Sequence, residues 1–133
     1  MRRLFLAVMC AVAIAITGVG TAGTAVASQD TSFGGTWTST DLDGSTQVLT
    51  IRGSGQGALA IFLLDDSATG ACGVSPAHVV GSGVPDGDTL VMYGTLTCLP
   101  GGNVLRFRIT FTLEYVPGAD VLVDESGVVW HRA

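Results

Sequence analysis

Polar and apolar residues alternate without a break between Leu105 and Tyr115. Apolar side chains occupy the odd positions from 105 to 115, and Arg, Thr or Glu side chains fill the even positions. Because successive side chains of a β-strand point to opposite faces, this period of two predicts a long strand with one apolar and one polar face. We expect the apolar face, which includes Ile109, to form one wall of a mostly filled core.

Seven further segments carry strand patterns, and short turns separate most of them. Asp43-Gly44, the run 53–57 and the segment 85–88 are typical turn sequences, because Gly adopts positive φ without steric cost. No segment after residue 27 shows a helical period with helix-start signals. The expected strands cover residues 35–40, 46–52, 58–65, 78–84, 89–98, 105–115, 121–123 and 128–132.

Eight strands joined by short turns favour an all-β protein built as an antiparallel up-and-down meander. A meander has two edge strands with unpaired backbone groups, and closure into a barrel pairs both edges. We therefore predict a closed eight-stranded barrel that spans residues 35–133 as a single domain. A two-sheet sandwich is the structural alternative, but it needs crossing connections that most of these turns are too short to make.

The first 27 residues have the pattern of a secretion signal. Arg2 and Arg3 form a positive start, residues 4–16 are apolar, and Ala25-Val26-Ala27 fits a small-x-small cleavage site. We expect cleavage after Ala27, secretion of the remaining chain and no membrane span after processing. Residues 28–34 would then form a short, flexible lead-in to the barrel.

The charge of the chain and its cysteine content limit the classes of partner and the cellular compartment that we expect. The whole chain has 6 basic and 11 acidic residues and no Lys, so removal of two Arg with the signal leaves 4 − 11 = −7. A nucleic-acid binder needs a basic surface, so we expect no nucleic acid as a partner.

Cys72 and Cys98 remain after processing, and an even count in an exported chain predicts one disulfide. Neither His78 nor His131 has zinc-ligand spacing to a Cys, and we expect no cofactor.

The two ends of the expected barrel carry a recognisable pattern. Gly35-Thr36-Trp37 opens the first strand, and Trp130-His131-Arg132 closes the last. Together with the eight expected strands, these two motifs resemble the pattern of the calycin superfamily, which includes lipocalins, avidins and small bacterial protease inhibitors. The resemblance implies that Trp37 packs near the closed end of the barrel and is covered by Arg132. If Trp130 points inward, Arg132 does too, and its guanidinium can stack within about 6 Å of the Trp37 ring.

Two branches of that superfamily imply different functions. Gly44-Ser45-Thr46 resembles the first hairpin of avidins, in which Ser45 would match a ligand-contacting position. Ser39 stands where avidins carry a biotin-binding Asn, and the one other Trp is Trp130, so biotin is not the expected ligand. The protease inhibitors resemble the chain in length and in their single disulfide. In them a flexible N-terminal segment enters a metalloprotease, and residues 28–33 would be that segment here.

Acidic residues gather in the odd-numbered turns of the meander, which share one pole, here called the odd-turn pole. Asp41-x-Asp43-Gly44 resembles the opening of a calcium loop, but a third acid and the Glu at the twelfth position are missing. Because Asp is common in turns for backbone reasons, we expect no metal site, with Asp41 and Asp43 as the only candidates. The acids of this pole are Asp41, Asp43, Asp65, Asp66, Asp124 and Glu125.

The sequence contains no catalytic constellation, because neither histidine lies in a nucleophile motif, and we expect no enzymatic activity. Two functions compete. The first is binding of a small apolar ligand in the barrel mouth at the odd-turn pole, where Gly81, Gly83 and Gly94 would leave space. The second is interaction with an extracellular protein, such as inhibition of a protease through the lead-in. A ligand carrier of this kind needs an apolar cavity of about 300 Å³ or more.

Overall fold

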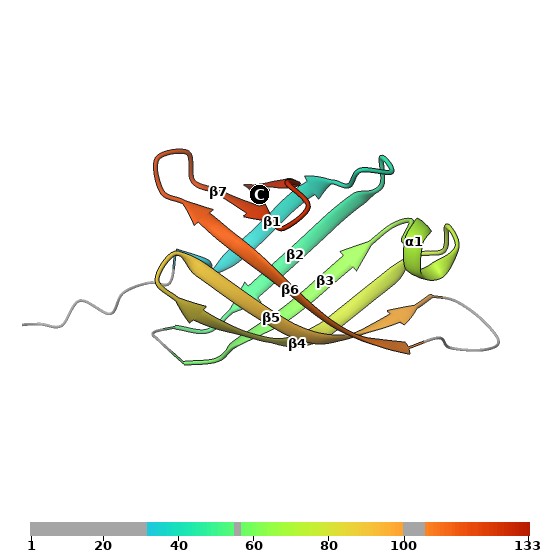
Figure 1. Cartoon of the computed structure of the whole chain (residues 1–133), viewed down its shortest axis with the longest axis horizontal. Coiled ribbons are helices and arrows are strands. Elements are labelled where there is room, and N and C mark those ends of the chain that lie inside the picture. The colour runs from blue at the N-terminus through green and yellow to red at the C-terminus, as the bar shows by residue number, and fades with distance from the viewer. Residues whose placement is uncertain (1–31, 55–56, 100–105) are drawn as a thin grey trace, which may run out of the picture.

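A computed structural model describes residues 32–54, 57–99 and 106–133, and the expected signal peptide lies outside these ranges. Eight antiparallel strands follow one another in chain order and close into a barrel (Figure 1). The all-β fold, the meander and its closure are therefore confirmed. The strands are β1 (Gly35–Thr40), β2 (Thr46–Arg52), β3 (Leu59–Asp65), β4 (Ala77–Asp86), β5 (Thr89–Cys98), β6 (Arg106–Val116), β7 (Val121–Asp124) and β8 (Val129–Arg132).

Two expected loops contain more regular structure than the sequence patterns indicate. The β3–β4 connection holds one helical turn, α1 (Thr69–Cys72), which is too short to show a helical period. β4 continues through Pro85, so the β4–β5 turn has two residues instead of the expected four, and Gly87 supplies the positive φ of 59° that such a turn requires. Within the described ranges, no helix has the length and hydrophobicity to cross a membrane.

The core fills the barrel from the inward faces of the strands. Burial alternates along β2 and β3, as a strand with one side in the core and one in water requires. The largest fully buried side chains are Phe33, Trp37, Leu49, Ile51, Leu59, Leu90, Met92, Leu113, Leu122 and Trp130.

β7 pairs with only the last part of β6. Residues 113–116 of β6 pair with β7, whereas residues 106–112 run past the end of β7. Leu113 is fully buried, but Ile109 is half-buried and Phe107 is 43% exposed. The expectation of a filled interior is therefore wrong beside residues 106–112. The physical reason is length, because β7 and β8 have 4 residues each and cannot cover a strand of 11.

β4 and β5 approach each other closely at a pair of facing glycines. Gly81 pairs with Gly94, and a Cβ on Gly81 would overlap the carbonyl oxygen of Tyr93. The close approach of the two backbones lets the strands curve. Leu90 occupies the space beside Gly83 and Val79 occupies the space beside Gly94, so these glycines do not open a ligand cavity.

Cys72 and Cys98 form the expected disulfide, with their Cα atoms 5.5 Å apart. The bond joins α1 to the last residue of β5. Because Ala77, the first residue of β4, pairs with Cys98, the disulfide holds the β3–β4 connection at the odd-turn pole.

Candidate functional site

Arg132 seals the end of the barrel where β1 begins and β8 ends, here called the closed end. Its guanidinium carbon lies 4.0 Å from the centroid of the Trp37 ring, inside the limit of about 6 Å for a cation–π contact. Nε and Nη2 donate to the two carboxylate oxygens of Asp120 at 2.9 and 2.8 Å. Nη1 donates to the carbonyl of Gly34 at 2.7 Å, and Nη2 donates to that of Ser32 at 3.0 Å. One side chain thus joins β8, the β6–β7 turn and the segment before β1.

Sequence reasoning missed the partners of Arg132 at the closed end. Asp120 adopts a positive φ of 49° in the β6–β7 turn, and the hydroxyl of Tyr115 donates to it at 3.0 Å. The Tyr115 ring packs edge-on against Phe33 and Trp37, with centroid distances of 6.1 and 6.5 Å. The hydrogen bonds from Arg132 lower the pKa of Asp120, and the bond to Asp120 raises the pKa of Tyr115. The sequence does not distinguish Asp120 from the other Asp residues in turns. Only the pairing of the strands shows that Asp120, Tyr115 and Arg132 meet.

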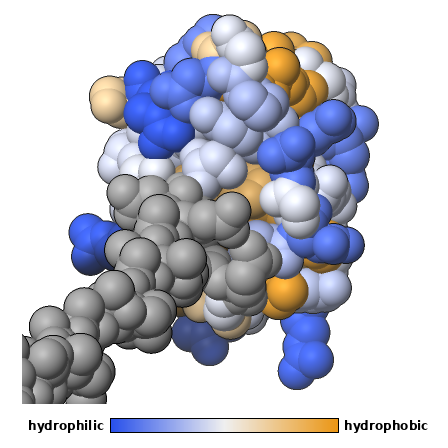
Figure 2. Space-filling model, turned by 90° about the vertical axis from the view of Figure 1, so that its left-hand side faces the viewer, coloured by the Kyte–Doolittle hydropathy of each residue, from blue (hydrophilic) through white to orange (hydrophobic). Residues whose placement is uncertain are grey.

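The segment before β1 is anchored to the barrel. Phe33 is 1% exposed, and its carbonyl accepts a hydrogen bond from Nε1 of Trp37 at 2.8 Å. The expected flexibility of the lead-in 28–34 is therefore wrong for residues 32–34, because a buried ring and the Arg132 hydrogen bonds hold them, while residues 28–31 lie outside the described ranges. Figure 2 views the barrel from this side, where hydrophilic residues alternate with smaller hydrophobic patches on the visible described surface.

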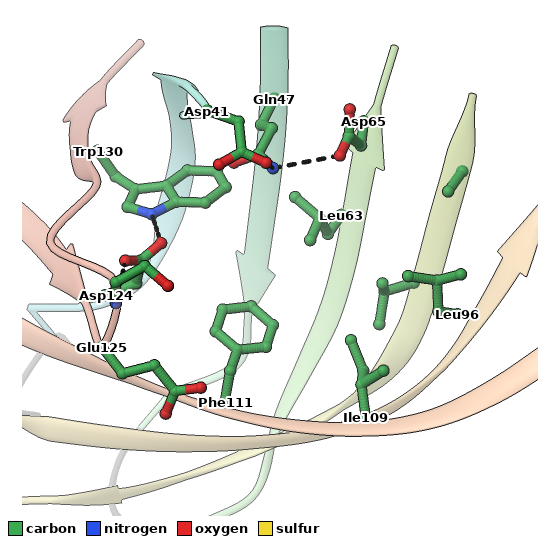
Figure 3. A pocket seen from close by; sticks show the side chains of 13 residues that line it. Asp41, Gln47, Leu63, Asp65, Leu96, Ile109, Phe111, Asp124, Glu125 and Trp130 are labelled. Atoms are coloured by element: carbon green, nitrogen blue, oxygen red, sulfur yellow. Dashed lines mark hydrogen bonds between the residues drawn. The ribbon is translucent and has the colours of Figure 1, made fainter. Parts of the chain in front are cut away.

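The odd-turn pole, at the opposite end, opens into a pocket of about 220 Å³. It lies beside the part of β6 that β7 leaves uncovered, and Trp130 of β8 forms part of its wall (Figure 3). The volume of this pocket is below the roughly 300 Å³ that a ligand carrier of the kind considered above needs. Its apolar lining comes from β3 to β6 and consists of Leu63, Ala77, Val79, Leu96, Ile109 and Phe111.

Acidic side chains form the rim of the pocket. Asp41 and Asp65 approach from the β1–β2 turn and the end of β3, and Asp124 and Glu125 approach from the end of β7 and the turn that follows it (Figure 3). Among the described residues that line the pocket there is no Arg or His. Among the described residues, the pocket therefore combines an apolar floor with a rim whose charged side chains are all acidic.

Gln47 holds two of the rim carboxylates in place. Its side chain sits at an inward position of β2 and is 9% exposed. Nε2 donates to Oδ2 of Asp41 at 3.0 Å and to Oδ2 of Asp65 at 3.3 Å, while Oε1 accepts from Oγ of Ser39 at 3.0 Å. A polar residue in line with the apolar Leu49 is the sequence signal that sets Gln47 apart, but that signal does not identify its partners.

Asp124 is held on the other side of the opening. Its Oδ1 accepts from the backbone amides of Ser126 and Val128 at 2.9 and 3.0 Å, and its Oδ2 accepts from Nε1 of Trp130 at 3.4 Å. Asp124 thus stabilises a turn, as Asp commonly does, and also presents its charge to the pocket.

Asp43 stabilises a turn and does not line the pocket. Hydrogen bonds from Thr69 and then from Ser45 hold the pKa of Asp43 at about 2. The amide of Ser45 donates to Oδ1 of Asp43 at 2.9 Å, within the β1–β2 turn. Ser45, which matches an avidin ligand contact, is buried but also does not line the pocket. Over residues 32–54, 57–99 and 106–133, no group of three or more His, Cys, Asp or Glu side chains could hold a metal ion, and Asp41 and Asp43 belong to no such group.

Neither of the two histidines lines the pocket. His78 stacks on Phe62 with ring centroids 6.1 Å apart, and His131 is exposed on β8.

Comparison of the chain with protein-family models, with curated proteins and with solved structures finds no match. The class of protein is therefore defined by geometry alone. It is a closed eight-stranded antiparallel barrel with one disulfide, with a closed end under Arg132 and a pocket at the odd-turn pole.

Proposed function

We propose that this chain is an exported, calycin-like binding protein that holds one small ligand in the pocket at the odd-turn pole and catalyses no reaction. The observation that carries the proposal is the combination of an apolar floor with polar side chains that hydrogen bonds hold in position. Small-molecule sites have this composition, because the apolar surface supplies affinity and a few fixed polar groups supply orientation.

The calycin likeness is supported by the closed end. Gly35-x-Trp37 opens β1, and Arg132 from the last strand covers the Trp37 ring at 4.0 Å. Export is supported by the N-terminal sequence pattern and by the Cys72–Cys98 disulfide, which is the kind of bond that persists in oxidising compartments.

The volume of the pocket limits the size of the ligand. An apolar cavity of about 150 Å³ holds one benzene ring. The pocket of about 220 Å³ has room for one ring with a short substituent. The proposed ligand is therefore smaller than the lipids or drug-sized molecules that occupy cavities of about 300–1,000 Å³.

The protein-interaction alternative is less well supported. It needs a mobile lead-in that can enter a protease, but Ser32 and Phe33 are bound to the barrel by Arg132 and Trp37. No contact of the described residues favours it over ligand binding.

Native mass spectrometry of the protein exported by its own host tests the proposal. We expect a retained small molecule that is lost when Leu96→Trp fills the pocket. Leu64→Trp, which adds the same side chain to the outer face of β3, should retain it. A thermal-shift screen of single-ring compounds on both variants provides a second readout. The proposal fails if the native protein carries no small molecule and no compound distinguishes the two variants.

A further inference from the structure

We infer that the ligand of this pocket is a small organic cation, in which an ammonium group is attached to one aromatic ring or to an aliphatic body of similar size. The inference rests on the proposed function, because it names the chemical class of ligand that the same pocket takes.

The first argument is the charge of the rim. Four carboxylates approach the opening from two sides, and no basic residue among the described lining offsets them. Their summed field attracts a cation and repels phosphates and carboxylates. Acidic turns alone would not define a site, but these carboxylates surround a cavity with an apolar floor. A molecule with a charged head and an apolar body matches both parts at once.

The second argument concerns the hydrogen bonds that the rim carboxylates accept within the protein. A carboxylate has about four acceptor positions. Among the described residues, Asp41 accepts hydrogen bonds from the amide of Leu42 and from Gln47, and Asp65 accepts from the amide of Ser67 and from Gln47. These bonds orient the two groups and use fewer than four positions on each. The remaining positions can accept N–H donors from an ammonium, and charge-assisted bonds of that kind are the stronger ones.

The third argument separates an organic cation from a metal ion. Calcium takes about 6–8 oxygen ligands, whereas the described residues form no group of three metal-binding side chains. An ammonium needs only one or two carboxylates. The rings of Trp130 and Phe111 also line the pocket, and the faces of such rings attract organic cations.

Three probes with the same ring and different heads test the inference on the exported protein. Phenethylammonium, 2-phenylethanol and phenylacetate carry a positive, a neutral and a negative head on a body that fits the pocket. We measure binding by calorimetry and by the NMR shift of the Trp130 indole N–H. We expect phenethylammonium to bind about fivefold tighter than the alcohol, phenylacetate to bind weakest, and the preference to shrink at high salt.

Two matched variants test whether the rim is responsible. Asp41→Asn with Glu125→Gln removes two charges from the rim. Asp86→Asn with Glu114→Gln removes two charges from exposed positions near the β4–β5 turn and leaves the pocket unchanged. We expect the preference for the cation to fall to about twofold or less in the rim variant and to persist in the control. Circular dichroism and melting temperature verify that both variants fold.

The outcomes distinguish this inference from the proposed function. If 2-phenylethanol binds as tightly as phenethylammonium, the cation inference is overturned while the pocket remains a ligand site. If the preference survives in the rim variant, the assignment to these carboxylates is overturned. If none of the three probes binds and the Leu96→Trp variant changes nothing, both the inference and the proposed function are wrong.

Discussion

Two polar side chains at inward positions organise the two ends of the barrel. Gln47 holds the carboxylates of Asp41 and Asp65 at the odd-turn pole, and Arg132 holds Asp120 over Trp37 at the closed end. A buried polar group such as Gln47 costs about 1–3 kcal/mol when its hydrogen bonds are unmet, and Gln47 has three partners. Arg132 is partly exposed, and it also has several partners.

Replacement of Arg132 should destabilise the fold more than replacement of another exposed Arg. We expect Arg132→Ala to lower the free energy of unfolding by about 2 kcal/mol, because it removes a stacked guanidinium and its bonds to Asp120 and the backbone. Arg132→Lys should fall between Ala and wild type, since a Lys cannot form the two-pronged contact. Urea unfolding measures the difference, with Arg108→Ala on β6 as the control. An equal loss in the control would contradict this role.

Asp43 should contribute to stability in a defined range of acid pH. Its pKa is about 2 in the fold against a usual 3.8, so its stabilising effect is present above about 3.8 and is lost as the pH falls through 2. We expect the melting temperature of the wild type to fall over this range. Asp43→Asn should reduce that fall and leave the acid response otherwise similar. Melting curves at pH 2 to 5 test this, and Asp86→Asn serves as the control. Parallel curves for wild type and Asp43→Asn would refute it.

At the scale of elements, strand length decides where the barrel is full and where it is open. β4, β5 and β6 have 10, 10 and 11 residues, whereas β7 and β8 have 4 each. The long strands extend beyond the short ones toward the odd-turn pole, and the pocket lies in the space that remains. The inward face of β6 therefore changes from core at Leu113 to pocket wall at Ile109.

The two parts of β6 should respond differently to a buried charge. Leu113→Asp should abolish folding, because an unpaired carboxylate would replace a fully buried side chain. Ile109→Asp should remain folded with a smaller loss of stability, because the new carboxylate faces a pocket that is open to water. Circular dichroism and melting temperature of the two variants make the comparison. If Ile109→Asp unfolds the protein as completely as Leu113→Asp, the open pocket is misplaced.

At the scale of the whole molecule, the barrel is closed by a strand pairing of only two residue pairs. β1 and β8 share only the pairs Trp37–Arg132 and Thr38–His131, while β4 and β5 pair over their whole length. The free energy of local opening should therefore be lowest along the seam between β1 and β8.

Hydrogen exchange should reveal this seam. We expect backbone amides of β8 to exchange at least about tenfold faster than those of β3, whose inward side chains are buried. A ligand in the pocket contacts Trp130 and should slow exchange in β8 more than in β3. NMR exchange with and without phenethylammonium measures both effects. Uniform exchange across all strands would show that the barrel opens only as a whole.

The fold was readable from the sequence because a β-meander is specified locally. The alternation from Leu105 to Tyr115 and the Asp-Gly turns locate the strands to within two residues, and short turns leave antiparallel pairing as the natural arrangement. The pairing of Cys72 with Cys98 was also readable, because only two cysteines follow residue 27, the end of the expected signal peptide.

The site was only partly readable. The acids of the odd-numbered turns and the pole that they share follow from chain order alone. The bond from Gln47 to Asp65 and the packing of Phe33 against Tyr115 do not, because each joins side chains from segments that are distant in the chain.

The sequence by itself determined the strands, their order, the disulfide and the pole at which charge gathers, because each depends on period, turn chemistry or count. Tertiary structure alone decided that the long strand forms both core and pocket wall, and that Asp41 faces the cavity while Asp43 does not. The first distinction depends on how far β6 extends past β7 after closure. That offset is a property of the closed barrel and cannot be assigned to any single segment.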